Sequence, residues 1–577
     1  MSEAEIRWVG GPVLYARVKD EFRIGEAIEV GANRHPGEVI RLKGDELVGQ
    51  VYEDTTGLRP GDPVHGTGAA LSVRLGPRLL GRIFDGLLRP LDTAEVNGDA
   101  AQQRIAFRPT VKAGDTLAGG AAFGALPGSV IRQFCLLPPD IAGTVESIAA
   151  EGEFDSAAKL CSIRDEAGAR HEIGYFQTWP IRQPRPVRER LPADEPMITG
   201  QRILDTLFPV ARGGRAAIPG GFGTGKTVLQ ETLAKWCDAD VIVYVGCGER
   251  GNEMAEVLRE FPKLSDPRTG RGLMERTVIV ANTSNMPVAA REASIYTAVT
   301  VGEYFRDQGL HVALMADSTS RWAEALREVS GRLGELPGEA AYPAYLGSRL
   351  AEFYERAARV KTLAGSNGSL TIIGAVSPPA GDFSEPVTSH TKRYVRCFWG
   401  LDRERAQARF YPAIHPLQSY SDGAARFSAW WTGRGNPEWG PQRERLLSLL
   451  EAQADLERMA RIVGKDALPP GQQLTLLCAE LVNESFLRQS AFSPVDRFCS
   501  PERQTAMLKL ILHFVALAQA ALARGVAPQA MAELDVLRRL QRMGEEIGED
   551  QLDKFADLSA GVDTAFAGLG KASSHAA

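Results

Sequence analysis

The sequence lacks several features that mark special classes of protein. It has only seven cysteines in 577 residues, and they form neither a CxxC pair nor an even framework. We therefore expect reduced, mostly buried thiols rather than a disulfide scaffold. The eight histidines are scattered along the chain, so no zinc site is predicted. The N-terminal residues do not show the basic-then-apolar order of a signal peptide.

Long uninterrupted apolar runs and an excess of basic residues are also missing. The most apolar stretch, residues 507–523, contains Lys509, His513 and Gln519, and the first two share a helical face with Arg524. This pattern is typical of an amphipathic core helix and argues against a membrane span. The formal net charge is −6, which gives the chain no general affinity for nucleic acid.

One stretch has the pattern of a phosphate-binding P-loop. Residues 220–227 fit G-x-x-x-x-G-K-[ST], and a short strand at 215–218 and a helix at 226–238 flank them. In such a loop backbone N–H groups face a polyphosphate, the lysine reaches the terminal phosphates, and the threonine hydroxyl joins the Mg²⁺ shell. A chain of this length and average composition contains this pattern by chance on the order of a few per cent of the time. The interpretation as a P-loop therefore depends on the flanking strand and helix. The predicted nucleotide-binding residues here are Gly220, Gly221, Phe222, Gly223, Thr224, Gly225, Lys226, Thr227 and Val228.

Around this loop, apolar strands alternate with helices, which predicts a mostly parallel sheet covered on both faces. Ligands of such sheets bind beyond the carboxyl ends of the strands. After about residue 436 only helical patterns remain. The expected strands lie at 241–245, 277–280, 311–315 and 370–373, and the expected helices at 291–306, 442–463, 472–488, 502–524 and 527–548, with disorder from 568. In the N-terminal part, turn-rich alternating segments at 6–18, 26–30, 38–42 and 46–52 predict strands of a small barrel or sandwich.

Two further strand ends carry acidic residues. The strand at 241–245 leads to Glu249, on a glycine-flanked turn beside Arg250, and the strand at 311–316 leads to Asp317. Glu249 suits a group that polarises the attacking water, and Asp317 suits a carboxylate that holds Mg²⁺ or its waters. Glu249 and Arg250 could instead form an ordinary surface ion pair.

Two other residues also have alternative interpretations. Asp317 could cap the following helix, although Ser318, Thr319 and Ser320 are better placed as caps. Tyr411 could pack in the core, or its ring could offer the flat apolar face that an adenine needs.

Taken together, these motifs resemble the catalytic A subunit of V-type and archaeal-type rotary ATPases over essentially the whole chain. The resemblance rests on residues 219–228, 246–254, 315–325 and 342–346. It implies a multidomain chain with a central α/β P-loop (RecA-like) domain. The expected boundaries are a β-barrel at 1–70, the first part of the nucleotide-binding domain at 71–109, a β-rich insertion at 110–188, the P-loop nucleotide-binding domain at 189–435 and a C-terminal α-helical domain at 436–577.

The same resemblance implies roles for the site residues. Lys226 would hold the β- and γ-phosphates, Thr227 the Mg²⁺ and Asp317 one of its waters. Glu249 would be the water-polarising carboxylate and Arg250 a contact of the γ-phosphate. Tyr411 and Phe492 would frame the adenine.

The implied function is synthesis or hydrolysis of ATP with Mg²⁺, coupled by rotation to proton or sodium transport through a separate membrane sector. The implied partners are B subunits, which alternate with this chain in an A3B3 ring and supply an arginine finger, together with a central shaft and peripheral stalks. The chain would then be cytoplasmic and peripheral to a membrane. Two alternatives remain open: a nucleotide-binding but non-catalytic ring subunit, and a protein-export or translocase ATPase with a similar core.

Overall fold

A computed structural model describes residues 2–91 and 104–572 and divides the chain into two compact units. The first unit contains Met1–Ala193, Arg212–Arg215 and Ala239–Val395. The second contains Asp194–Ala211, Ala216–Asp238 and Arg396–Ala577. The predicted fold class is confirmed: the chain has an N-terminal β-barrel, a β-rich insertion, an α/β part with a parallel sheet and a helical C-terminal part.

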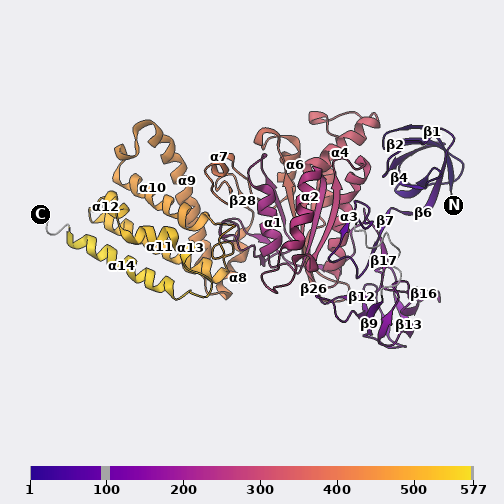
Figure 1. Ribbon diagram of the computed structural model, residues 1–577, viewed down its shortest axis with the longest axis horizontal. Helices are drawn as coiled ribbons and strands as arrows, with labels where there is room; N and C mark the ends of the chain where they lie inside the picture. The colour runs from indigo at the N-terminus through magenta and orange to yellow at the C-terminus, as the bar shows by residue number, and fades with distance from the viewer. Residues whose placement is uncertain (1, 92–103, 573–577) are drawn as a thin grey trace. The chain divides into compact units, whose positions relative to one another are not determined.

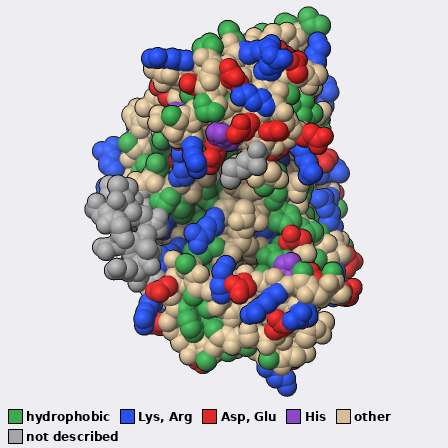
Figure 2. Space-filling model, turned by 90° about the vertical axis from the view of Figure 1, so that its right-hand side faces the viewer, with side chains coloured by type: hydrophobic (Ala, Val, Ile, Leu, Met, Phe, Trp, Pro, Cys, Tyr) green, Lys and Arg blue, Asp and Glu red, His purple; other side chains and the backbone are tan. Residues whose placement is uncertain are grey.

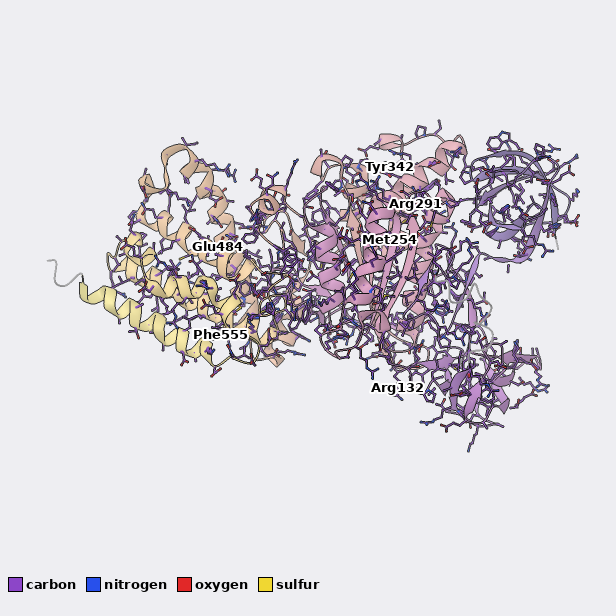
Figure 3. The ribbon with its side chains drawn as sticks, viewed as in Figure 1. Arg132, Met254, Arg291, Tyr342, Glu484 and Phe555 are labelled. Atoms are coloured by element: carbon purple, nitrogen blue, oxygen red, sulfur yellow. The ribbon has the colours of Figure 1, made fainter. Side chains whose placement is uncertain are left out.

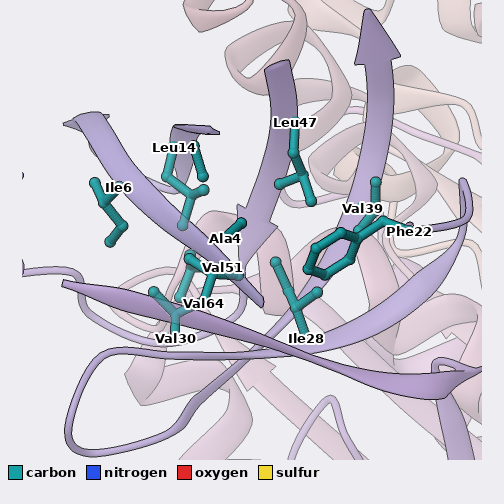
Figure 4. Close-up of a cluster of buried hydrophobic side chains, with 11 residues drawn as sticks. Ala4, Ile6, Leu14, Phe22, Ile28, Val30, Val39, Leu47, Val51 and Val64 are labelled. Atoms are coloured by element: carbon teal, nitrogen blue, oxygen red, sulfur yellow. The ribbon is translucent and has the colours of Figure 1, made fainter. Parts of the chain in front are cut away.

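The first unit begins with a closed β-barrel, drawn in indigo in Figure 1. Its strands follow the order β1-β2-β5-β4-β3-β6, and apolar side chains such as Ile6, Leu14, Ile28 and Leu47 fill its interior (Figure 4). The prediction of one strand over 6–18 is wrong, because the chain turns between residues 10 and 13 and forms an antiparallel hairpin. The strands are β1 (Glu3–Gly10), β2 (Val13–Val18), β3 (Glu26–Val30), β4 (His35–Lys43), β5 (Glu46–Val51) and β6 (Pro63–Ala70).

The β-rich insertion consists of two four-stranded sheets around one apolar cluster. The sheets have the orders β10-β13-β15-β16 and β12-β11-β9-β14. The cluster includes the buried rings of Phe107 and Phe123, whose centroids are 6.1 Å apart. The strands are β9 (Ile105–Pro109), β10 (Thr116–Leu117), β11 (Ala122–Ala125), β12 (Phe134–Leu136), β13 (Gly143–Ile148), β14 (Gly152–Phe154), β15 (Cys161–Arg164) and β16 (Arg170–Ile173).

A parallel sheet completes the first unit. Its strands β26 (Asn367–Val376), β24 (His311–Asp317), β22 (Val241–Glu249), β23 (Thr277–Thr283) and β8 (Ile83–Phe84) lie side by side in that order. Helix α3 (Val288–Asp307) packs across β22, β23 and β24, while α4 (Thr319–Arg332) packs against β22 and β26. The four predicted strands are confirmed, and each is longer than its apolar run. As a result Glu249 and Asp317 are themselves the last residues of β22 and β24.

The second unit holds the P-loop and the C-terminal helices. Strand β21 (Arg215–Pro219) pairs in parallel with β27 (Cys397–Phe398) and leads to α1 (Lys226–Trp236). The predicted single helix over 527–548 is wrong, because the chain breaks between α12 (Pro528–Ala532) and α13 (Asp535–Glu546). Disorder from 568 is also wrong in part, since α14 (Lys554–Ala572) continues past it; residues 573–577 lie outside the described residues. The remaining long helices are α9 (Trp439–Val463), α10 (Pro470–Val482) and α11 (Pro501–Ala523).

Two expectations about apolar groups can be compared with the structure. All seven cysteines are free thiols with buried side chains. Helix α11 is long and apolar enough to cross a membrane by length and composition alone, but half of its most apolar window is buried inside the protein. This burial supports the interpretation of α11 as a core helix.

Candidate functional site

The P-loop forms the start of α1 in the second unit. Gly225 precedes the helix in the left-handed region, with φ of 83°, a conformation that glycine adopts without strain. The buried Thr224 hydroxyl donates a hydrogen bond of 2.8 Å to the carbonyl of Gly221 and closes the loop. Lys226 and Thr227 are the first two residues of α1, the end of a helix at which the helix dipole favours a phosphate.

A cavity of about 790 Å³ opens beside the P-loop within the second unit. Gly223, Thr224, Gly225 and Val228 contribute to its lining from the P-loop and α1, and Tyr411 and Phe492 contribute from two distant segments. Phe492 is 92% exposed, so its ring presents an open face. Glu484, labelled in Figure 3, also lines the cavity. The structure therefore brings the predicted aromatic pair and the phosphate loop to one cavity of a size typical for small-molecule ligands.

The hydroxyl of Tyr411 ties its ring to α1. It lies 2.9 Å from the Thr232 hydroxyl and donates to the Val228 carbonyl at 3.4 Å. Burial raises the pKa of Tyr411, so the hydroxyl stays protonated at neutral pH. The ring is thus fixed at the cavity by its own polar group.

Arg202, which no sequence motif predicts, also lines the cavity. Its guanidinium is buried and donates to the carbonyls of Phe486 and Arg488 at 2.7 and 2.6 Å, and to Asp496 Oδ1 at 2.5 Å. The backbone N–H of Gln489 donates to the Tyr411 carbonyl at 2.7 Å. These bonds fix both ends of the segment that carries Phe492.

In the first unit, Glu249 and Asp317 lie at the carboxyl edge of the parallel sheet. In the pairing of β22 with β24, Gly246 is opposite Asp317, and Glu249 follows after an irregularity in β22. The sequence predicts that Glu249 lies on a turn. This prediction is wrong, because Glu249 is the last residue of strand β22. Its side chain is buried, as is that of Asp317, which accepts a hydrogen bond of 3.3 Å from the Tyr244 hydroxyl. Ser318, and not Asp317, caps α4 by accepting from the Arg321 N–H.

The glycines of β22 make room for long side chains at this edge. A Cβ atom on Gly246 would lie 1.7 Å from Met254 Cε, and one on Gly248 would lie 2.6 Å from Arg291 Cδ. Figure 3 labels Met254 and Arg291. Burial raises the pKa of the intervening Cys247 thiol to about 12, so this residue is a packing group and not a nucleophile.

Comparison with known proteins identifies the family. Family models described as the nucleotide-binding domain and the beta-barrel domain of the ATP synthase alpha/beta family match residues 200–421 and 7–68. A model of the ATP synthase alpha/beta subunit barrel-sandwich domain matches 99–182, and the C-terminal domain of V and A type ATP synthase matches 428–531. The A subunit of the A-type ATP synthase of Methanopyrus kandleri is 50% identical over 98% of this chain and 98% of its own length. The chain belongs to the ATP synthase alpha/beta family.

Two other members of this family are similar to the chain over nearly its whole length. The V-type ATP synthase alpha chain of Halothermothrix orenii is 49% identical over 97% of this chain and 98% of its own length. The A subunit of the A-type ATP synthase of Desulfurococcus sp. is 50% identical over 93% of this chain and 94% of its own length. The resemblance drawn from the motifs is confirmed.

The structure also adds residues to the predicted set for this ATP synthase family member. Arg291, in the first turns of α3, is buried, and its Nε has no hydrogen-bond partner among the described residues. Arg321 approaches Gly248 and forms an ion pair of 2.9 Å with Glu324. Burial and the neighbouring Glu249 carboxylate raise the pKa of Glu253. Arg291 lies on α3, the helix that follows β23, so the rule on strand ends leads to this part of the chain but not to Arg291 itself.

Proposed function

We propose that this chain is the catalytic A subunit of an A/V-type rotary ATP synthase, in which it makes or hydrolyses ATP. The near full-length identity of about half to the A subunits of A-type ATP synthases supports the activity. The observation in the structure that carries the proposal is the P-loop, which lines one cavity together with Tyr411 and Phe492. Such a cavity offers a phosphate site and an aromatic site for a base, which are the two parts of a nucleotide.

We assign roles to the residues at the two sites as follows. Lys226 binds the β- and γ-phosphates, and the N–H groups from Gly220 to Val228 cradle the rest of the polyphosphate. Tyr411 and Phe492 hold the adenine between aromatic faces. Glu249 orients and polarises the water that attacks the γ-phosphate, and Arg250 contacts that phosphate. Arg291, whose Nε has no partner within the described ranges, is a further donor for negative charge at the carboxyl edge of the sheet.

Mg²⁺ fits the side chains that are present. Within residues 2–91 and 104–572, no group of three or more His, Cys, Asp or Glu side chains is arranged to hold a metal ion. Mg²⁺ does not need such a group, because it keeps several waters and binds through one or two side chains and the substrate phosphates. We assign the Thr227 hydroxyl to Mg²⁺ and the buried Asp317 carboxylate to one of its waters. The ion neutralises charge on the phosphates when it is bound.

The proposed partners follow from the same family. We propose that the chain alternates with B subunits in an A3B3 ring, that each B subunit supplies an arginine finger, and that a central shaft and peripheral stalks complete the complex. The complex couples ATP turnover to proton or sodium movement in a membrane sector, with this chain on the cytoplasmic side. Figure 2 shows basic and acidic side chains interspersed over one face of the protein, without the broad basic field that nucleic acid would need.

Mixing experiments test this function. We expect Mg-ATP turnover when the chain is assembled with B subunits of the same complex type, and little turnover by the chain alone, because the arginine finger comes from the partner. Steady-state phosphate release from the purified assembly measures it. Equal turnover by a homohexamer of this chain would contradict the proposal and favour a translocase. Tightly bound ATP without turnover in the assembly would indicate a non-catalytic ring subunit.

The aromatic part of the cavity leads to a second prediction. Phe492→Ala should weaken ATP binding by about 5- to 150-fold, since stacking of one base on an aromatic ring contributes about 1–3 kcal/mol. Phe492→Tyr should retain the affinity, and Leu336→Ala, which removes an equally exposed apolar side chain in the first unit, should leave it unchanged. Titration of the assembled complex measures the dissociation constant. Inorganic tripolyphosphate should bind all variants alike, because it has no base; a matching loss for tripolyphosphate would show that the loop had been disrupted instead.

A further inference from the structure

A second cavity lies within the first unit, and no step proposed above uses it. It has a volume of about 410 Å³. Five segments line it: the start of β4, the residues after β5, the turn that follows β8, the end of β23 and the beginning of α3 with the residues just before it. We call it the Asn282 cavity, because Asn282 lines it from the penultimate residue of β23.

Asn282 is the feature that points to a ligand. Its side chain is 1% exposed, and neither Nδ2 nor Oδ1 has a hydrogen-bond partner among the described residues. Buried polar groups are almost always hydrogen-bonded, because an unpaired one loses its water without compensation. The amide lies at the carboxyl end of a parallel strand, the edge at which ligands of such sheets bind. An occupant of the cavity can supply both missing bonds.

The other polar side chains of the cavity already have hydrogen-bond partners, which for Tyr52 and Asp54 are Glu38 and Thr56 outside the lining. Arg89 Nε donates to Asp85 Oδ2 at 2.6 Å, and its Nη1 pairs with Glu53. His35 Nδ1 lies 2.7 Å from Glu53 Oε2. The Asp85 carboxylate also accepts from the N–H groups of Leu87 and Arg89, at 2.9 and 2.8 Å. Asn282 is therefore the group in the described lining whose bonding is incomplete.

The charged side chains of the lining indicate which kind of molecule the cavity can bind. The lining carries the carboxylates of Glu53, Asp54 and Asp85 against the guanidinium of Arg89. This balance disfavours an anion such as phosphate. The lining also offers the apolar side chains of Leu91, Met286, Pro287 and Ala290. The cavity is also much larger than the volume of a single water, which is about 30 Å³.

We propose that the Asn282 cavity binds a small, uncharged, planar molecule that carries an amide-type edge. Such an edge has an N–H donor beside a C=O acceptor, as in carboxamides, lactams and nucleobases. It can accept from Nδ2 and donate to Oδ1 of Asn282 at once, while the body of the molecule packs against the apolar wall. The site lies outside the nucleotide cavity, so it does not depend on the function proposed above.

Benzamide is a suitable probe, because it joins a carboxamide edge to an apolar ring. Titration of the full chain, followed by saturation-transfer NMR, should show binding in the millimolar range. Benzoate has the same shape but is an anion without the donor, and it should bind at least about tenfold more weakly, the difference that one hydrogen bond makes. Asn282→Ala should weaken benzamide binding by a similar factor. Asn285→Ala, three residues further on and exposed, is the matched control and should leave the affinity unchanged.

A measurement of local stability tests the same proposal in a second way. Because the amide has no hydrogen-bond partner among the described residues, Asn282→Ala should leave the hydrogen-exchange protection of β23 nearly unchanged, and benzamide should raise that protection more in the wild type than in the variant. Equal benzamide affinity in the wild type and Asn282→Ala would overturn the proposal. So would binding that is present in the chain alone but lost in the assembled complex, because a neighbouring protein would then fill the cavity.

Discussion

Glu249→Gln should lower Mg-ATP turnover by the assembled complex by about 10²- to 10⁴-fold, the usual contribution of a positioned general base. Glutamine has nearly the same shape as glutamate and still accepts a hydrogen bond, but it has no negative charge with which to polarise water. The side chain is buried at the end of β22, where such a charge is screened little by solvent. ATP binding should be retained, because the phosphate contacts are assigned to the P-loop.

The control for this variant is Glu256→Gln. Glu256 is exposed on α2 (Gly251–Glu260), the helix that follows Glu249, and its substitution should leave turnover unchanged. Phosphate release gives the turnover number, and calorimetric titration gives the ATP affinity of each variant. Turnover at the wild-type rate in Glu249→Gln would remove Glu249 from the chemistry. A parallel loss of ATP affinity would show instead that the substitution had disturbed the fold of the site.

Local patterns predicted the architecture well wherever the physical cause of an element is local. Continuous apolar runs identified the four parallel strands, because strands buried on both faces have no polar alternation. The hairpin of β1 and β2 was missed although Gly10, Gly11 and Pro12 give a turn signal between the two strands. The break between α12 and α13 was also missed, because helical periodicity persists across the two residues that separate them.

The residues of the candidate site also differ in whether a local sequence pattern predicts them. The P-loop is a contiguous motif, and Glu249 and Asp317 follow from the rule that ligands bind at strand ends. Arg202 could not be found in this way, because its partners Phe486 and Asp496 lie 284 and 294 residues away in the sequence. Asn282 is similar: an asparagine at the end of a strand becomes notable only when its burial and the cavity beside it are known.

Glu303→Gln should destabilise α3 by about 3–5 kcal/mol, the cost of removing one partner from a buried ion pair. The Glu303 side chain is 1% exposed and accepts from Arg356 Nε at 3.1 Å and Arg356 Nη2 at 2.5 Å. The backbone N–H of Arg185 also donates to it at 3.0 Å, and Arg306 Nη1 lies 3.6 Å from Oε1. A glutamine would place an N–H group among these donors and leave the buried Arg356 guanidinium without its counter-charge, whereas Arg306 would keep its ion pair of 2.7 Å with Asp307.

Hydrogen exchange of the α3 amides in the full chain measures this loss as a local opening free energy, which suits a chain of several domains better than one unfolding transition. The matched control is Glu328→Gln on α4. Glu328 forms an exposed pair with Arg332 at 3.1 Å and should contribute less than about 1 kcal/mol. Equal protection of α3 in Glu303→Gln and the wild type would contradict the assigned role of the buried pair.

The pH dependence gives this prediction a second, independent readout. Burial alone would raise the pKa of Glu303, but Arg356 and Arg306 outweigh it and hold the pKa below its ordinary value. A carboxyl group with a lowered pKa in the folded state stabilises the protein fully above the pKa of the unfolded state, about 4.3 for glutamate. That stabilisation is lost as the pH falls through the folded-state pKa. Protection of α3 should therefore decrease below about pH 4 in the wild type. The same decrease should be smaller in Glu303→Gln, which has no proton to take up at this position.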